Sequence, residues 1–131
     1  MYTVSDIIAA LGKHSDEAAI GVLEKVGTNC SDNEVRKMTA KALIQRNTHD
    51  SLKVLIINKG KGIHDYNEDV SKSVVGMLKA QKDKSETLKI LEDTIEFHSD
   101  NEVKEKSEEV RNIIINSTSP FLSKLPSFSL N

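Results

Sequence analysis

The sequence has no tryptophan, and aromatic residues of all kinds make up only 4% of its 131 residues. It also has only six glycines and two prolines, fewer turn signals than a sheet protein of this length needs. Charged residues, by contrast, reach 29%. We therefore expect an all-α protein whose core is built from Leu, Ile, Val, Ala and Met.

Cysteine and long apolar runs are scarce as well. The single cysteine, Cys30, excludes an internal disulfide and a metal site made of several cysteines, and no base lies beside it in the sequence to activate it. No apolar stretch approaches the roughly 20 residues that span a bilayer. Residues 1–11 carry Asp6 and lack the basic start of a signal peptide. We expect a soluble, cytoplasmic protein that contacts no membrane.

The charged residues are unevenly distributed along the chain. Residues 35–89 hold 12 basic and six acidic side chains, whereas residues 1–34 and 90–116 are both acidic overall. The formal net charge of −2 therefore conceals a basic middle between two acidic flanks.

Apolar residues recur at helical spacing along most of the chain, for example at Val4, Ile7, Ile8 and Leu11. This pattern predicts seven helices, at about 3–12, 16–26, 34–46, 50–57, 69–81, 86–97 and 102–116. The inward residues of the sixth are predicted to be Leu88, Leu91 and Ile95.

One pentapeptide, Ser-Asp-Asn-Glu-Val, occurs twice, at 31–35 and 99–103, and a related sequence lies between them at 66–70. Serine followed three residues later by glutamate has the spacing of a helix capping box, so we expect Ser31 and Ser99 to cap helices. Further predicted helix signals are Asp50 and Ser85 as caps and Gly27 as a stop.

The valines that end these three segments are 35 and 33 residues apart, at Val35, Val70 and Val103. A second register aligns the segments 20–24, 52–56 and 88–92 at similar intervals. Two registers with one period indicate repeated helical pairs that stack to bury their apolar faces. We predict three pairs and a seventh helix over residues 1–116, followed by an extended arm over 117–131.

The segment Asp32-Asn33-Glu34-Val35-Arg36, continuing to Ala42-Leu43, resembles the first helix of a HEAT repeat, particularly the short bacterial and archaeal HEAT-like repeats. The corresponding segments near Val70 and Val103 match this pattern more weakly. The resemblance implies an α-α superhelix, a right-handed stack of helical hairpins. It also implies a role in protein binding or scaffolding.

The favoured function is a non-enzymatic interaction module with no cofactor, because no catalytic constellation is present in the sequence. A protein partner is expected to bind a shallow concave face formed by the second helices. The residues predicted to contact this partner are Glu24, Lys53, Lys89 and Glu92.

Nucleic acid binding through the basic middle is the alternative. The residues that would contact phosphates are Lys41, Arg46, Lys79, Lys82 and Lys84. The negative overall charge and the lack of interleaved aromatic residues weigh against this alternative. His14 and His49 precede helix starts and could share a metal with nearby carboxylates, but exposed turn residues are the simpler interpretation.

The last 15 residues contain both prolines and five large apolar residues, which are Phe121, Leu122, Leu125, Phe128 and Leu130. That is more apolar surface than a solvated linker requires. The segment could fold back on its own stack, mediate self-association by docking on a neighbouring molecule, or be disordered.

Overall fold

The computed structural model describes residues 3–28, 30–58, 61–62 and 67–118. Within these residues the chain forms α1 (Val4–Lys13), α2 (Ala18–Val22), α3 (Asn33–Arg46), α4 (His49–Ile56), α5 (Glu68–Ala80), α6 (Ser85–Phe97) and α7 (Asn101–Thr118). A π-helical segment, η1 (Leu23–Thr28), continues α2. A short antiparallel ladder joins β1 (Ile57–Asn58) to β2 (Lys61–Gly62). The expected all-α character is confirmed.

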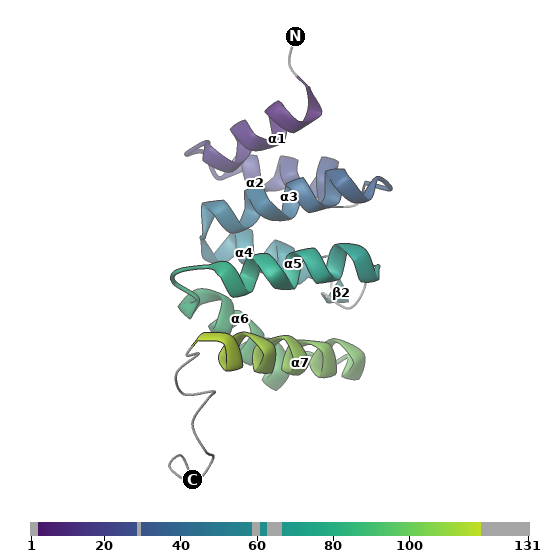
Figure 1. Ribbon diagram of the computed structural model, residues 1–131, viewed down its shortest axis with the longest axis vertical. Coiled ribbons are helices and arrows are strands. Elements are labelled where there is room, and N and C mark those ends of the chain that lie inside the picture. The colour runs from purple at the N-terminus through teal and green to yellow at the C-terminus, as the bar shows by residue number, and fades with distance from the viewer. Residues whose placement is uncertain (1–2, 29, 59–60, 63–66, 119–131) are drawn as a thin grey trace, which may run out of the picture.

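The helices form two rows. In Figure 1, α1, α3, α5 and α7 follow one another down the front of the molecule, while α2, α4 and α6 lie behind them. Neighbours within each row are in contact, and α3 also packs across the rows against η1 and α4. The seven helices of the described residues therefore follow one another in the order that the sequence predicted.

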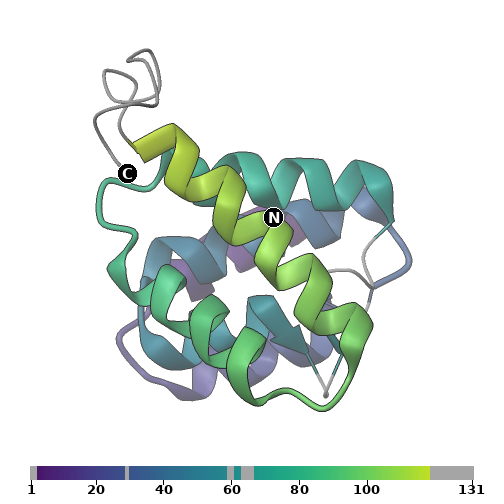
Figure 2. The same ribbon diagram turned by 90° about the horizontal axis from the view of Figure 1, so that it is seen from below.

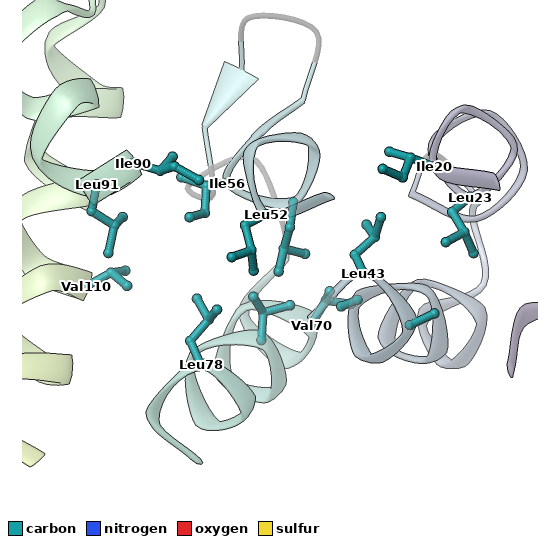
Figure 3. Close-up of a cluster of buried hydrophobic side chains, with 14 of the residues drawn as sticks. Ile20, Leu23, Leu43, Leu52, Ile56, Val70, Leu78, Ile90, Leu91 and Val110 are labelled. Atoms are coloured by element: carbon teal, nitrogen blue, oxygen red, sulfur yellow. The ribbon is translucent and has the colours of Figure 1, made fainter. Parts of the chain in front are cut away.

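The core lies between the two rows, and its buried hydrophobic residues are all aliphatic among the described residues. Figure 3 shows Leu43, Val70 and Leu78 from the front row facing Leu52 and Ile56 from the back row. Leu43, Leu52, Ile56 and Leu78 are all 0% exposed. Because each pair contributes side chains to the same layer, burial depends on the neighbouring pairs as much as on the pair itself.

Side-chain hydrogen bonds between neighbouring front helices repeat at the interval seen in the sequence. Near the start of the helices, Asn67 Nδ2 donates to Asn33 Oδ1 at 2.7 Å, and beyond their ends Gln81 Nε2 donates to Asn47 Oδ1 at 3.3 Å. Both bonds join residues 34 positions apart. Helices α3 and α5 therefore lie side by side, with these two contacts one residue short of the 35 residues between Val35 and Val70.

The helix caps differ from the prediction. In both copies of the pentapeptide the aspartate is the cap: Asp32 Oδ1 accepts the Glu34 amide at 2.8 Å, and Asp100 Oδ1 accepts the Glu102 amide at 2.9 Å. Ser31 lies one residue before the cap of α3, so the predicted Ser31–Glu34 capping box is wrong. The aspartate stands one residue closer to the helix, where its side chain reaches the second amide.

The other two predicted caps are also wrong. Thr48, not Asp50, caps α4, through a hydrogen bond from the Ser51 amide to Thr48 Oγ1 at 3.1 Å. Ser85 is the first residue of α6, and its amide donates to Asp83 Oδ1 at 3.0 Å. The two hydrogen bonds that Ser85 donates lower the pKa of the Asp83 carboxyl. Thr48 has the extended backbone that a cap needs, whereas Lys84, the residue before α6, makes no side-chain capping bond.

Asp32→Ala is expected to lower the free energy of unfolding by about 1 kcal/mol, because it removes the cap of α3. Urea unfolding followed by circular dichroism measures the change. Ser31→Ala is the matched control and should leave stability unchanged within about 0.5 kcal/mol. If Ser31→Ala lowered the free energy of unfolding more than Asp32→Ala does, the predicted Ser31–Glu34 capping box would be supported instead.

Two further boundaries depart from expectation. Gly27 does not end the second helix by adopting a left-handed conformation; it is buried inside η1 and packs against α3. At the other end of the described chain, α7 continues to Thr118, so residues 117 and 118, which were predicted to belong to the extended arm, are helical. The remaining part of the arm, 119–131, lies outside the described residues.

Candidate interaction groove

The most distinctive surface of the back row is an open groove of about 380 Å³ between α4 and α6. Its walls come from residues far apart in the sequence. They are His49, Lys53 and Ile57 from α4 and β1, and Ile90, Asp93, Thr94, Phe97 and His98 from α6 and the turn after it. The groove exists because α4 and α6 are neighbours within the back row.

Phe97, the last residue of α6, is the dominant apolar group of this groove. It is 75% exposed, the largest value among the exposed large hydrophobic residues of the described chain. The buried positions of α6 are Thr87, Ile90, Leu91 and Thr94. Phe97 follows Thr94 by three residues and so lies on the same side of the helix, but it stands beyond the last buried turn, and its ring is left at the surface. An exposed aromatic ring beside a groove with an apolar floor is typical of an interaction site.

Basic, acidic and uncharged polar side chains line the groove beside the Phe97 ring. Lys53 and Asp93 are exposed on opposite walls. His49 Nδ1 lies 2.5 Å from Glu86 Oε1, a contact that links α4 to α6 at the side of the groove. His98 Nδ1 accepts the Asp100 amide at 3.0 Å, which fixes its ring against the start of α7. The groove therefore combines an apolar centre with a polar rim, as protein interfaces do.

The four predicted partner-binding residues do not form one cluster. Lys53 lines the groove. Lys89 and Glu92 are exposed on α6 outside it, and Glu92 Oε1 accepts a hydrogen bond from Arg111 Nε at 3.2 Å, which joins α6 to α7. Glu24 is half-buried in η1. The second helices thus present one predicted residue in the groove and place the other three elsewhere.

Two of the residues predicted to bind nucleic acid, Lys41 and Lys79, lie on the front row of helices. Lys41 lines the grooves between α1 and α3 and between α3 and α5, and Lys79 lines the groove between α5 and α7. Lys82 is exposed in the turn after α5, where the Lys84 ammonium donates to the Gln81 carbonyl. Lys84 is thus used to close the end of α5.

Arg46 has an intramolecular role. Its guanidinium donates to the carbonyl oxygens of Leu11 at 2.9 Å and Asp16 at 3.2 Å, and also to that of His14. These carbonyls belong to the end of α1 and the turn before α2. Arg46 therefore fastens the last turn of α3 to the first helical pair.

Arg46→Lys is expected to lower the free energy of unfolding by about 1–3 kcal/mol, because an ammonium cannot reproduce a planar fork shared among three carbonyls. The matched control is Arg111→Lys, which alters an exposed ion pair with Glu92. That change should cost less than about 1 kcal/mol. Thermal or urea unfolding compares the two, and equal losses would argue against the fastening role of Arg46.

The two histidines considered as metal ligands are engaged separately. His14 Nδ1 accepts the Asp16 amide at 3.0 Å, whereas His49 faces Glu86. Across the described parts of the chain, no group of three or more His, Cys, Asp or Glu side chains is arranged to hold a metal ion. None of the helices described is long and apolar enough to cross a membrane.

Sequence reasoning missed Phe97, Asp93 and His98 because it assigned the binding face of α6 to Lys89 and Glu92. Of the residues predicted to be inward, Leu91 is buried and Leu88 and Ile95 are half-buried, while Thr87 and Thr94 are buried as well. One signal could have identified Phe97: it is the only phenylalanine before residue 121, and it lies at the end of a helix. Comparison of the chain with protein family models, with curated proteins and with solved structures gives no match.

Proposed function

We propose that this chain is a HEAT-like helical repeat module, a right-handed α-α superhelix, that binds a protein partner in the cytoplasm and catalyses no reaction. The groove between α4 and α6 is the binding site. The observation that carries the proposal is the exposed Phe97 ring beside the apolar floor of that groove.

The chemistry of the groove defines the kind of partner. Ile57, Ile90 and Phe97 offer apolar surface, while Lys53 and Asp93 offer one charge of each sign at the rim. A peptide segment with a large apolar anchor and flanking polar groups matches this arrangement. The volume of about 380 Å³ accommodates a few side chains rather than a whole domain.

Selection of displayed random peptides on the intact chain tests the proposal. We expect selected peptides to carry an aromatic or aliphatic anchor and to bind Phe97→Ala at least about tenfold more weakly, because a buried large side chain contributes that much. Lys53→Glu should change the charge preference of the selected peptides.

The matched control is Ile7→Ala, which removes apolar surface from a residue that is 52% exposed on α1. It should leave peptide binding unchanged. If the selected peptides bind Phe97→Ala as tightly as they bind the unmodified chain, the groove is not the binding site.

Nucleic acid binding is a second candidate, favoured by the lysines of the front row. The lysines that line its three inter-helix grooves are Lys13, Lys37, Lys41, Lys72, Lys79 and Lys106. Several of them already face carboxylates. Lys37 Nζ lies 2.8 Å from Asp69 Oδ2, and that hydrogen bond raises the pKa of Lys37. We therefore rank this candidate below protein binding.

Titration with a mixed-sequence oligonucleotide at low and high salt tests this second candidate. Binding should weaken as salt rises and should be reduced by the double change Lys41→Glu and Lys79→Glu. Lys89→Glu is the matched charge reversal on α6. Absence of binding at low salt removes the candidate.

A further inference from the structure

We propose that the groove between α4 and α6 receives the C-terminal segment 119–131 of a second copy of this chain. The inference rests on the proposed function, because it names the occupant of the same groove. It makes the chain self-associating, with the arm of one copy held by the Phe97 groove of its partner.

The composition of the segment suits the groove. Residues 119–131 carry five large apolar side chains and a single charged side chain, Lys124. Two of the five are phenylalanines, and aromatic rings that meet edge to face or offset gain more than their buried area provides. The Asp93 carboxylate on the groove wall offers a partner of opposite charge for Lys124.

The core gives an independent reason to assign the phenylalanines to an interface. The buried cluster is made only of aliphatic residues within the described chain. Phe97, the one phenylalanine of the described residues, is mostly exposed. The remaining two, Phe121 and Phe128, lie in the segment that follows α7. An exposed ring on one surface and apolar residues on a terminal segment are complementary parts of one contact.

The direction of α7 favours a second copy over the same molecule. Helix α7 starts at Asn101, close to Phe97, and runs to Thr118 at the opposite side of the stack, as Figure 2 shows. Its 18 residues cover about 27 Å at roughly 1.5 Å per residue. A return to Phe97 within one molecule would use about eight extended residues at roughly 3.3 Å each.

That return would leave only Phe128 and Leu130 to enter the groove, with Phe121, Leu122 and Leu125 used as connecting chain. Docking on a second molecule imposes no such limit, so any of the five apolar side chains can be among the few that the groove holds. Two copies that exchange arms form a closed, two-fold pair in which each groove is filled once.

Light scattering coupled to size-exclusion chromatography, across a range of concentrations, measures the mass of the intact chain. We expect a dimer that dissociates on dilution. Phe97→Ser should weaken dimerisation at least about tenfold, and so should the double change Phe121→Ser and Phe128→Ser. Ile7→Ser, an equal loss of exposed apolar surface on α1, should leave the dimer intact.

Mixing the two defective variants decides between one molecule and two. The Phe97→Ser chain keeps a normal arm, and the Phe121→Ser, Phe128→Ser chain keeps a normal groove. An equimolar mixture should regain association through one arm and one groove, at lower affinity than the unmodified dimer. Failure of the mixture to associate, where the unmodified chain does, would overturn docking in a second copy.

A monomeric mass for the unmodified chain at all concentrations would also overturn the inference, as would a dimer unaffected by Phe97→Ser. Neither outcome affects the proposed function, because selection of peptides by the groove is measured separately. If peptides bind through Phe97 while the chain stays monomeric, the groove takes a different protein. If the chain dimerises through Phe97 but selects no foreign peptide, the self-contact stands alone.

Discussion

Leu52→Ala is expected to lower the free energy of unfolding by about 2–5 kcal/mol, which is a large part of the stability of a domain of this size. Leu52 is 0% exposed and lies in α4, the middle helix of the back row. Helix α4 contacts α2, α3 and α6. Loss of the leucine side chain therefore opens a cavity next to the interfaces with both neighbouring pairs.

Urea unfolding at 25 °C, followed by circular dichroism, measures this loss. The matched control is Lys53→Ala, one residue further along α4, where the side chain is exposed. The control should change stability by no more than about 0.5 kcal/mol. A loss below about 1 kcal/mol for Leu52→Ala would mean that neighbouring side chains relax into the vacated space. The middle of the stack would then not be the part where core truncation costs most stability.

The helices and their order were predictable because apolar spacing repeats along the chain. The period of the pentapeptide also indicated which helices are equivalent. Asn33 and Asn67, near the starts of α3 and α5, are joined by a side-chain hydrogen bond over 34 residues, close to the 35 that separate Val35 and Val70. A periodic sequence thus carries information on which helices lie in register, beyond the existence of each helix.

The caps were not predictable to the residue. Ser31 and Asp32 are both good capping residues, and the choice between them depends on which one adopts the extended backbone before the first turn. Asp32 does so, with φ −82° and ψ 119°. The position of a helix start within a run of several polar residues is set by packing of the helix that follows, which a local pattern does not contain.

The inward face of α6 was predicted only in part, because Leu91 is buried as expected but Thr87 and Thr94 were not predicted to be inward. Thr94 is buried, and its hydroxyl donates to the Ile90 carbonyl at 2.7 Å. The Thr87 hydroxyl donates to Gln81 Oε1 at 2.8 Å. A buried threonine whose hydroxyl is satisfied in this way leaves only its methyl group to the core, so it acts there as a small apolar residue.

The candidate groove was only partly predictable for a related reason. Lys53 lies on the row of second helices, as predicted, but the groove also needs Asp93 and Phe97, which lie beside the buried residues of α6. Neighbouring residues on a helix are turned by roughly 100° about its axis, so a residue one position away from a groove residue points in another direction. The partner residues Lys89 and Glu92, chosen from the sequence, consequently lie beside the groove rather than in it.

Gly27→Ala is expected to lower the free energy of unfolding by about 1–3 kcal/mol or more, although alanine is the better helix former. Gly27 is buried in η1, directly against α3. A Cβ at this position would lie 1.9 Å from Thr39 Oγ1 and 2.6 Å from Thr39 Cγ2. Thr39 cannot turn away without cost, because its hydroxyl is buried and donates to the Val35 carbonyl at 2.8 Å.

The same substitution at Gly21, six residues earlier, should raise the free energy of unfolding rather than lower it. Gly21 is exposed in α2, and a Cβ there would meet nothing within 4 Å, so alanine should stabilise by about 1 kcal/mol. Thr39→Ala removes the two nearest atoms but leaves the Thr39 Cβ 2.7 Å away, so it should rescue Gly27→Ala only in part. A double-mutant cycle by urea unfolding measures that coupling. If Gly27→Ala stabilised the chain as Gly21→Ala should, η1 and α3 would be further apart than this contact requires.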